Sequence, residues 1–480
     1  MKKILFFILF PFLGISQTQI GASINGLAMG DLCGTSVSLS SDGNTLAVGE
    51  LLSDGNGINS GSVRVFQYTT GTWTQIGLTI NGQTSGDRNG VSVSLSANGS
   101  VLAIGADYNA VGGVNSGSVR IFQNISGSWT QLGVTIYGQQ ANAQFGHKVS
   151  LSSDGTTVAI GNFGGNSVHI YKNTTGNWIQ LGTAINGLQT DDFNGFSVSL
   201  SSDGSIVAIG AVYGDGLDIG YVRVFQNTSS NWIQVGATID GLVADDFSGH
   251  SVSLSSDGST VAIGAIGNDG SFSNAGSVRV YKNTLGTWGL VGEAINGEAI
   301  DDFSGWIVSL SSDGTKVAIG TPFNDGNGLN SGSVRVYQYT LGTWTKLGID
   351  IDGESIKELN GRSVSLSKDG TKVAIGAPFK DINGLTDSGS VRVFDLTTIL
   401  SSDNFVQANI LVYPNPTSQN LTIGLQNGLE IQKINFYNNL GQKIKTATTI
   451  TTSVADLAKG SYFVEVVTNL GKATKTIIVD

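Results

Sequence analysis

The sequence predicts an all-β protein whose main part is a closed seven-bladed β-propeller. The phrase Ser-Val-Ser-Leu-Ser-Ser-Asp-Gly recurs with little change, and consecutive copies lie 49 to 56 residues apart. A period near 50 residues is typical of propellers and solenoids. The Asp-Gly of the phrase, once Asn-Gly, falls at Asp42, Asn98, Asp154, Asp203, Asp257, Asp313 and Asp369. Seven copies, each with four strand-like runs, indicate seven blades of four strands.

Each copy has its four runs in the same order. A first strand, Gly-x-Ser-Val-Ser-Leu-Ser, is followed by Asp-Gly, which favours the positive-φ turn of a tight hairpin, and by a second strand, Val-Ala-Ile-Gly. A loop rich in Gly and Asn leads to a third strand, Gly-Ser-Val-Arg-Val-Phe, and a fourth, Trp-x-x-Ile/Leu-Gly. Short apolar and β-branched runs between turn residues are typical of strands. The Trp of the fourth strand recurs at Trp73, Trp129, Trp178, Trp232, Trp288 and Trp344.

The two ends of the repeat region complement each other. Residues Thr18–Gly26 match the fourth-strand segment Thr74–Gly82, whereas the seventh copy stops after Phe394 without a Trp strand of its own. An open solenoid needs atypical capping repeats, but a ring does not. We therefore expect the N-terminal strand to complete the last blade and to close a ring over residues 17–397, which leaves no free sheet edge at the seam.

The first 16 residues have the features of a secretory signal peptide. Two lysines precede an apolar run over residues 4–13, and Gly14 and Ser16 stand at the −3 and −1 positions of a cleavage site. The run is far shorter than the ~20 residues that span a bilayer. No later segment approaches that length, so we expect an exported protein without a membrane span in its mature form.

Composition and charge argue against several functions. The 480 residues include 36 acidic and 25 basic ones, for a net charge of −11. Such a charge repels polyanions, so we expect no nucleic-acid partner. The single cysteine, Cys33, forbids an internal disulfide, and three histidines without a CxxC or HExxH motif provide no recognisable zinc site. We expect no metal, no cofactor and no catalytic residue.

Two further sets of charged residues are predicted to be structural. An Arg recurs in the third strand of six copies, with His169 in the remaining one, and is expected to form hydrogen bonds between blades. Acidic pairs such as Asp191-Asp192 precede Phe in three loops between blades. Paired carboxylates serve in general acid–base catalysis, but here we expect them to accept hydrogen bonds from N–H groups of their own turns.

One position varies while its neighbours barely change. The residue after the glycine that opens each first strand is, in chain order, Thr35, Val91, His147, Phe196, His250, Trp306 and Arg362. Chain connectivity places this variable column near the mouth of the central channel. Aromatic, imidazole and guanidinium groups gathered there would suit a sugar ring or a peptide. The candidate ligand-binding residues are therefore His147, Phe196, His250, Trp306 and Arg362; ordinary packing between blades is the alternative.

The copies resemble the FG-GAP repeats of integrin α-chain propellers. Phe145-Gly146 matches the Phe-Gly that opens the first strand of those repeats, and Gly376-Ala377-Pro378 matches the Gly-Ala-Pro that closes the second. The resemblance extends over most of residues 17–397. Members of that family often bind calcium through an Asp-x-Asp/Asn-x-Asp-Gly loop. The corresponding turn here is only Ser-Ser-Asp-Gly, too short for the six or more oxygen ligands of calcium, so we do not expect that site.

After a mostly polar linker at 398–408, residues 409–480 predict a small β-sandwich. Tyr413-Pro414-Asn415-Pro416 opens this segment, and Leu457, Gly460 and Tyr462 follow the spacing Leu-x-x-Gly-x-Tyr. In these features and in its terminal position it resembles the type A C-terminal sorting domain of the type IX secretion system. The resemblance implies a secretion-machinery partner, transport across the outer membrane of a Gram-negative cell of the Bacteroidota type, and release or surface attachment. An ordinary terminal sandwich is the alternative.

The sequence thus favours a secreted or cell-surface binding or adhesion protein whose propeller recognises a glycan or protein ligand. We do not expect an enzyme, since the chain has no nucleophile elbow, phosphate loop or triad pattern. Two alternatives remain open. One is a structural surface protein without a dedicated ligand, and the other is a polysaccharide lyase or hydrolase that uses the channel mouth.

Overall fold

The computed structural model describes residues 17–214, 217–340, 342–397, 406–407, 409–426, 429–469 and 471–480. The predicted signal peptide and most of the predicted linker lie outside the described residues. The chain divides into two compact units, of which the larger comprises Thr18–Lys346 and Asp350–Leu396 and the smaller includes Thr397–Asp480. The named elements of the described residues are strands apart from one short 3-10 turn, Phe163–Gly165. The prediction of an all-β protein is confirmed.

The larger unit contains seven antiparallel sheets in its described residues, numbered below in chain order. Sheet one holds β3 (Cys33–Leu39), β4 (Thr45–Glu50), β5 (Ser62–Thr69), β6 (Thr72–Gln75) and β7 (Ile80–Asn81). Sheet two holds β8 (Ser92–Leu95), β9 (Val101–Ala106), β10 (Ser118–Ile125), β11 (Ser128–Gln131) and β12 (Ile136–Tyr137). Sheet three holds β13 (Phe145–Leu151), β14 (Thr157–Asn162), β15 (Ser167–Thr174), β16 (Asn177–Gln180) and β17 (Ile185–Asn186). Sheet four holds β18 (Asn194–Leu200), β19 (Ile206–Ala211), β20 (Tyr221–Thr228), β21 (Asn231–Gln234) and β22 (Ile239–Asp240).

The remaining three sheets follow the same order. Sheet five holds β23 (Ser248–Leu254), β24 (Thr260–Ala265), β25 (Ser277–Thr284), β26 (Thr287–Leu290) and β27 (Ile295–Asn296). Sheet six holds β28 (Ile307–Leu310), β29 (Lys316–Thr321), β30 (Ser333–Thr340) and β31 (Thr343–Asp352). Sheet seven holds β32 (Ser363–Leu366), β33 (Lys372–Ala377), β34 (Ser390–Asp395), β1 (Thr18–Gln19) and β2 (Ile24–Asn25). Strands from both ends of the larger unit therefore share one sheet.

The pairing in sheet seven joins the first described segment of the chain to the end of the repeat region. Thr18 pairs with Asp395 and Gln19 with Phe394, so β1 runs antiparallel to β34. β2 pairs with β34 as well, through Ile24 and Val391. These strands occupy the place that the Trp strand occupies in the other sheets.

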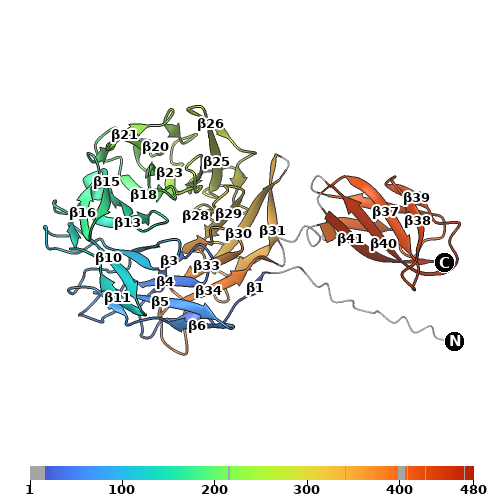
Figure 1. Ribbon diagram of the computed structural model, residues 1–480, viewed down its shortest axis with the longest axis horizontal. Coiled ribbons are helices and arrows are strands. Elements are labelled where there is room, and N and C mark those ends of the chain that lie inside the picture. The colour runs from blue at the N-terminus through green and yellow to red at the C-terminus, as the bar shows by residue number, and fades with distance from the viewer. Residues whose placement is uncertain are drawn as a thin grey trace. The chain divides into compact units, whose positions relative to one another are not determined.

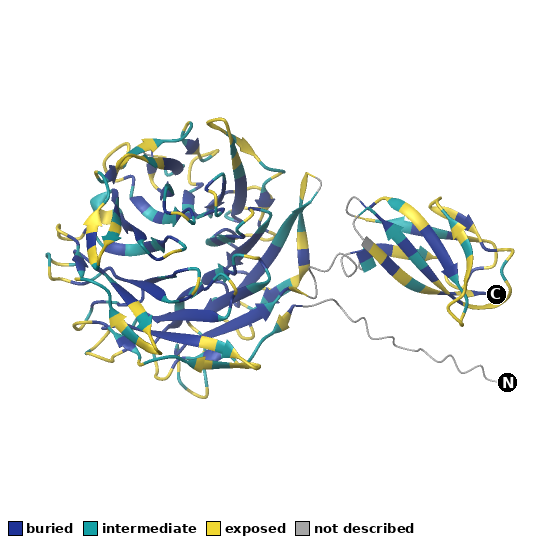
Figure 2. Cartoon of the chain, in the orientation of Figure 1, coloured by how far each residue is buried: buried dark blue, intermediate teal, exposed yellow. Residues whose placement is uncertain are grey.

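The seven sheets surround a common centre, with their first strands innermost (Figure 1). Each first strand lies beside the first strand of the next sheet, and β32 of sheet seven lies beside β3 of sheet one. The second strands are buried on both faces because each sheet packs between two others; Leu46, Ala47 and Val48 of β4 have no exposed surface. Figure 2 shows the same pattern, with buried residues along the middle strands and exposed ones in the loops. Burial of these strands supplies most of the apolar core.

Glycines allow neighbouring sheets to approach within backbone contact. A Cβ built on Gly264, at the end of the Val-Ala-Ile-Gly strand, would lie 2.0 Å from the carbonyl oxygen of Gly305, which opens the first strand of the next sheet. Real Cβ atoms do not come so close to an oxygen. The same pair recurs at all seven boundaries, as Gly49/Gly90, Gly105/Gly146, Gly161/Gly195, Gly210/Gly249, Gly264/Gly305, Gly320/Gly361 and Gly376/Gly34.

Hydrogen bonds cross every one of these boundaries along the inner strands. The Leu39 N–H donates to Ser365 Oγ at 3.0 Å, which links sheet one to sheet seven. The equivalent pairs are Leu95–Ser38, Leu151–Ser94, Leu200–Ser150, Leu254–Ser199, Leu310–Ser253 and Leu366–Ser309. The inner-strand serines, which the repeat keeps small, thus also satisfy backbone donors of the neighbouring sheet.

A ring of backbone hydrogen bonds follows the ends of the first strands. The N–H of each residue in the series donates to the carbonyl of the next, and the series is Ser41, Ala97, Ser153, Ser202, Ser256, Ser312 and Lys368. The Lys368 N–H then donates to the carbonyl of Ser41 at 3.1 Å, which completes the cycle. Backbone groups that would otherwise be unpaired at the end of a strand are paired with the next sheet.

The fourth strands are joined at the outside by their tryptophans. Trp73 Nε1 donates to the carbonyl of Ile20 at 2.9 Å, and the later tryptophans donate to the fourth strand of the preceding sheet at 2.8 to 3.1 Å. Gln17 stands at the matching position of the N-terminal segment, and its Nε2 donates to Leu347 O at 3.1 Å. The tryptophans therefore link neighbouring sheets.

The expected hydrogen bonds between sheets are found for four of the six repeated arginines, Arg64, Arg120, Arg223 and Arg392. Arg279 and Arg335 instead donate within their own sheets. Arg120 Nη2 of sheet two donates to the carbonyl of Asn81 in sheet one at 2.6 Å, and Arg392 Nη2 of sheet seven donates to Asp352 O in sheet six at 2.7 Å. The second acid of each pair accepts hydrogen bonds within its own loop; Asp192 Oδ2, for example, accepts from the Gln189 N–H at 2.7 Å. These loop carboxylates are buried as turn caps and do not form an acid–base pair.

The smaller unit has two antiparallel sheets around its own apolar core. One sheet holds β35 (Ile410–Tyr413), β36 (Asn420–Leu425) and β39 (Thr451–Ser453), and the other holds β38 (Lys443–Ala447), β37 (Ile431–Tyr437), β40 (Gly460–Thr468) and β41 (Gly471–Val479). Ile410 and Leu421 of the first sheet pack in one cluster with Phe436 and Val464 of the second. Across the described parts of both units, we find no helix with the length and apolar character needed to cross a membrane.

The glycine contacts predict a position-specific effect of one added methyl group. Gly264→Ala should lower the free energy of unfolding by about 3 kcal/mol, because its Cβ would meet the backbone of sheet six and the sheets would have to separate. Gly289→Ala in β26 is the control, since the nearest atom beyond its neighbours is 4.0 Å away. Chemical denaturation of both variants measures the difference. Equal stabilities would contradict the proposed role of the contact.

Candidate functional site

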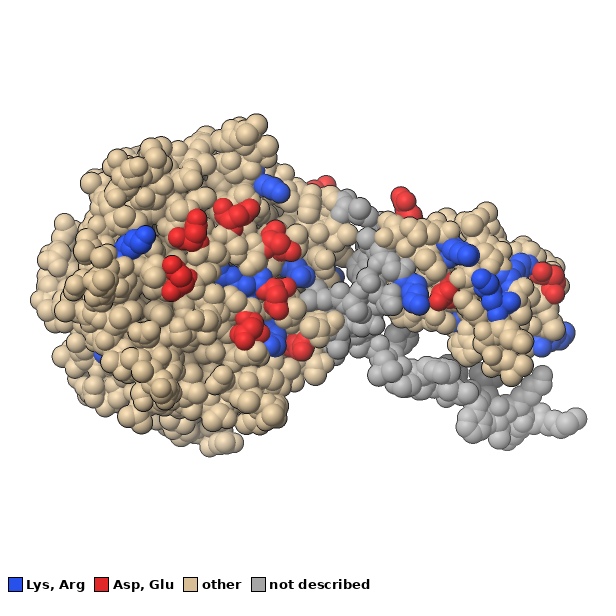
Figure 3. Space-filling model, in the orientation of Figure 1, with Lys and Arg blue, Asp and Glu red and all other residues tan. Residues whose placement is uncertain are grey.

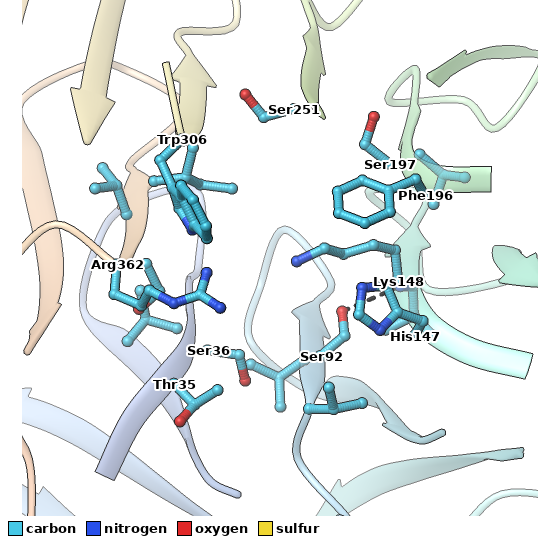
Figure 4. A pocket seen from close by; sticks show the side chains of 18 of the residues that line it. Thr35, Ser36, Ser92, His147, Lys148, Phe196, Ser197, Ser251, Trp306 and Arg362 are labelled. Carbon is cyan, nitrogen blue, oxygen red and sulfur yellow. Dashed lines mark hydrogen bonds between the residues drawn. The ribbon is translucent and has the colours of Figure 1, made fainter. Parts of the chain in front are cut away.

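A cavity of about 300 Å³ lies among the first strands, and all seven residues of the variable column line it. They are Thr35, Val91, His147, Phe196, His250, Trp306 and Arg362. The structure therefore brings together every candidate ligand-binding residue of the sequence analysis. Figure 4 shows His147, Phe196, Trp306 and Arg362 directed into the cavity from different sheets.

A glycine with positive φ frees each column residue from strand pairing. In sheet four, Asn194 pairs with Ala211 and Ser197 with the adjacent Gly210, so Gly195 and Phe196 form a bulge. Gly195 has φ +93°, a backbone conformation that residues other than glycine rarely adopt. A bulge re-aims the side chain that follows it. Sheets one, three and five have the same register shift, and in the other three sheets the column residue precedes the first strand.

Aromatic rings form an arc along sheets three to six. The ring centroids of His147 and Phe196 are 5.5 Å apart, those of Phe196 and His250 are 5.0 Å apart, and those of His250 and Trp306 are 4.6 Å apart. Two phenylalanines extend the arc: Phe163 lies 4.6 Å from His147, and Phe323 lies 5.5 Å from Trp306. Tilted and edge-to-face contacts of this kind stabilise a fixed arrangement of rings.

Sequence reasoning missed Phe163 and Phe323. Both follow the second strand of their sheets, β14 and β29, rather than lying in the first strand. The signal was present, because the residues after the Val-Ala-Ile-Gly strand also differ between copies. The third copy is shortest, and a 3-10 turn at Phe163–Gly165 replaces the longer loop of the others.

Sequence reasoning also missed Lys148, which lines the cavity beside His147. The corresponding residue is a serine in five other copies and Ile307 in the sixth. Where it is serine, the hydroxyl mostly donates to the glycine carbonyl of the next sheet: Ser36 to Gly90, Ser197 to Gly249, Ser251 to Gly305 and Ser363 to Gly34, at 2.7 to 2.8 Å. Lys148 departs from this structural role and extends into the cavity (Figure 4).

Burial sets the charge of the cavity at neutral pH. It lowers the pKa of His250 to about 3, with the positive charge of Arg362 adding to the effect. It also lowers the pKa of His147, whose hydrogen bond to Asp107 acts in the opposite direction. Burial, together with the charge of Arg362, lowers the pKa of Lys148 to about 8, and burial lowers that of Arg362 to about 10. Near pH 7 the cavity therefore presents the cations Lys148 and Arg362 and two neutral imidazoles. Arg88 lines it as well, with its Nε 3.9 Å from Oδ1 of Asp107.

Hydrogen bonds fix the tautomers of the two imidazoles. His250 Nδ1 lies 3.0 Å from the carbonyl oxygen of Trp306 and must carry the proton, since a carbonyl only accepts. His147 Nδ1 lies 3.1 Å from Oδ2 of Asp107 and donates to this carboxylate. Each ring then keeps an unprotonated Nε2, which accepts a hydrogen bond. A ligand hydroxyl is a suitable donor.

The opposite end of the first strands has a different character. Lys368 reaches from sheet seven across the ring, and its Nζ donates to Ser153 Oγ at 3.1 Å and to Ser202 Oγ at 2.9 Å. The column residues precede the first strands or lie near their start, whereas Lys368 follows the end of β32. The candidate site is therefore the end that carries the variable column.

Metal and covalent chemistry have little support in the site. Within the described ranges, no three His, Cys, Asp or Glu side chains are placed to hold a metal ion. Cys33 is buried away from the cavity, and burial together with Glu50 raises its thiol pKa, which disfavours the reactive thiolate. Among the residues that line the cavity there is no Asp or Glu.

Comparison with known proteins assigns the C-terminal unit. Residues 411–480 match the family described as secretion system C-terminal sorting domain. The predicted sorting domain is confirmed, and it supports export by the type IX route to the cell surface or the medium. No curated protein matches the sequence.

Two solved structures share the general fold. One is a Bacteroides uniformis protein assigned provisionally as a 6-phosphogluconolactonase, with TM-score 0.51 and 13% identity over 86% of this chain and 97% of that one. The other is hydrazine synthase from Kuenenia stuttgartiensis, with TM-score 0.50 and 13% identity over 77% and 97% of the two chains. At such identity the likeness concerns the fold alone, which is propeller-like.

The sorting domain predicts where a truncated protein will be found. A chain that lacks residues 409–480 should fold its larger unit, because the smaller unit has a separate core, but should remain in the periplasm of the native host. Cell fractionation with immunoblotting against the full-length control measures the distribution. Truncated protein in the medium or on the cell surface would refute a sorting role.

Proposed function

We propose that this protein is a secreted or surface-attached binding protein of a Gram-negative bacterium, an adhesin whose propeller recognises a glycan or protein ligand. One observation carries the proposal: a single position that varies between neighbours that barely change lines one cavity in all seven copies. A repeat keeps the residues that its architecture requires and is free to vary elsewhere. Variation that converges on a single concave surface is what a binding site on a ring requires.

We further propose that the seven sheets are the blades of a closed propeller related to the FG-GAP repeats. The contact between β32 and β3, the cyclic hydrogen bonds through Lys368 and Ser41, and the Gly376/Gly34 approach support closure. The pairing of β1 with β34 supports a closing role for the N-terminal strand. Such a ring has no unpaired edge at its seam.

The composition of the cavity favours a glycan over a peptide. Aromatic rings line sheets three to six, and sugar rings stack their apolar C–H faces on such surfaces. Neutral His147 and His250 each offer a nitrogen acceptor for a sugar hydroxyl. A volume of about 300 Å³ suits a small unit of a polymer rather than a folded partner. Binding to glycan and matrix-protein arrays tests the proposal, and silence on both would favour a structural role.

Removal of the N-terminal strand tests the proposed seam. Deletion of residues 17–27 from the mature chain should expose the edge of β34 and lower the melting temperature sharply, because β1 and β2 pair only with that strand in the described sheets. Thermal denaturation against the mature chain that begins at Gln17 is the measurement. An unchanged melting temperature would refute closure by this strand.

Truncation of the aromatic side chains tests the proposed site. Trp306→Ala and Phe196→Ala should each weaken binding to the glycan found on the array by about 2 kcal/mol, since buried aromatic contacts are of this size. Both variants should fold, because Thr35 and Val91 occupy the same column in other copies. Phe272→Ala is the control, as Phe272 is 48% exposed and does not line the cavity. Lost stability with intact affinity would show that the rings serve packing instead.

A further inference from the structure

Two positive side chains meet in the cavity without a negative partner. Lys148 belongs to β13 of sheet three, and Arg362 directly precedes β32 of sheet seven. Figure 4 shows the ammonium and the guanidinium directed toward one another across the cavity. Over the part of the chain that the structure describes, neither head group lies within 4.0 Å of a carboxylate oxygen. The guanidinium of Arg362 instead lies 4.5 Å above the ring of Trp306.

This arrangement is unfavourable in the free protein. Like charges repel, and the surrounding protein limits the water that would otherwise screen them. The carboxylate that attracts Lys148 is that of Asp107. Its Oδ2 is already engaged with His147 at 3.1 Å, and its Oδ1 lies 3.9 Å from Arg88. Asp107 is therefore shared with His147 and Arg88, and among the described residues neither Lys148 nor Arg362 has a carboxylate in contact with it.

The third copy gives up a structural hydrogen bond to place a cation there. In four other copies the serine at this position donates to the next sheet, and a lysine cannot repeat that contact while it extends into the cavity. The positive cavity also contrasts with the net charge of −11 of the chain. On the face of the larger unit seen in Figure 3, acidic and basic side chains lie close together. The unpaired cations are thus a local feature of the cavity.

We propose that the ligand carries a carboxylate, as the acidic sugar unit of a polysaccharide does, and that Lys148 and Arg362 hold this group between them. The inference rests on the proposed function, because it assigns the ligand class of the same site. A carboxylate has two oxygens, so one can accept from the ammonium and the other from the guanidinium. Phe196 and the arc beside it contact the sugar ring, and the free Nε2 atoms of His147 and His250 accept hydrogen bonds from its hydroxyls.

The location of the protein favours a sugar acid over a phosphorylated metabolite. The C-terminal sorting domain directs export, and sugar units that carry carboxylates are common in extracellular polysaccharides. The aromatic arc adds a surface that suits a pyranose ring better than an extended acidic peptide. A peptide and a sulfated glycan are therefore outcomes of the test rather than part of the proposal.

The test compares acidic oligosaccharides with their uncharged counterparts. The mature full-length protein is titrated by calorimetry with oligomers of galacturonate, glucuronate and mannuronate, and with the methyl ester of each. We expect at least one acidic oligomer to bind and its ester, in which the charge is removed but the ring is kept, to bind at least about tenfold more weakly. Acidic peptides and sulfated oligosaccharides are titrated in parallel.

Two substitutions by residues from other copies of the repeat test the contribution of each cation to binding. Lys148→Ser and Arg362→Thr introduce residues that other copies already have at these positions, so the fold should be kept. Each should weaken binding of the acidic oligomer at least about tenfold and leave binding of the ester unchanged. Lys282→Met, on the exposed part of β25, is the control and should not alter the affinity. Melting temperatures confirm that the variants fold.

The pH dependence of binding gives a readout that packing would not produce. Arg362, His147, His250 and Asp107 face Lys148, and Arg88 lines the same cavity beside Asp107. The pKa of Arg362 is about 10 and that of His250 about 3. The pKa of His147 is lowered, which places its titration below neutral pH. As the pH rises through about 8, Lys148 loses its proton and the affinity for the acidic oligomer should fall. The fall should be absent in Lys148→Ser.

The possible results distinguish a failure of the carboxylate assignment from a failure of the proposed binding function. Neutral esters that bind as well as the acids would keep the binding function and overturn the carboxylate assignment. Preference for a sulfated glycan or an acidic peptide would also overturn it. Absence of binding to every saccharide would overturn both the inference and the glycan form of the proposed function.

Discussion

The approach of two glycines at each sheet boundary is the constraint on which the larger unit depends. The last glycine of a second strand meets the carbonyl of the glycine that opens the next first strand, and a Cβ there would lie about 2 Å from that oxygen. Only at this separation do the inner-strand serines reach across to the neighbouring backbone. The narrow centre, and hence the small cavity, follows from the same contact. Any side chain at these positions would push the sheets apart and widen the channel.

The same glycines separate what the repeat must keep from what it can vary. The positive φ of the opening glycine removes the following residue from strand pairing. The N–H of that residue donates instead to the carbonyl three residues earlier, as Phe196 does to Phe193, and this bond places no demand on the side chain. Threonine, valine, histidine, phenylalanine, tryptophan and arginine are all accepted there because each points toward the channel. Architecture is thereby held by seven equivalent contacts, and the chemistry of the cavity is left to one free position per sheet.

Local pattern was enough to predict the strands, the turns and the convergence of the column. Asp-Gly marked the hairpins, and the spacing of the copies placed Phe196, His250 and Trp306 at equivalent points of successive sheets. The rest depended on distances that no local pattern encodes. Lys148 stands where serine usually has a structural role. Its role in binding can be inferred only from the structure, which places Arg362 across the channel from it. Phe163 reaches the arc because the shortest copy closes with a 3-10 turn.

A second lysine in the same ring shows that the chain can satisfy a buried ammonium. Lys368 replaces a residue that is serine in five of the six other copies, as Lys148 replaces serine. Its Nζ crosses to two hydroxyls, Ser153 Oγ and Ser202 Oγ, and burial lowers its pKa without leaving it unpaired. Serines line the inner strands at both ends, so equivalent acceptors were available near Lys148. Lys368, at the end opposite the variable column, is held by its own chain, whereas Lys148 extends toward Arg362. This difference argues that the unpaired cation is reserved for a ligand.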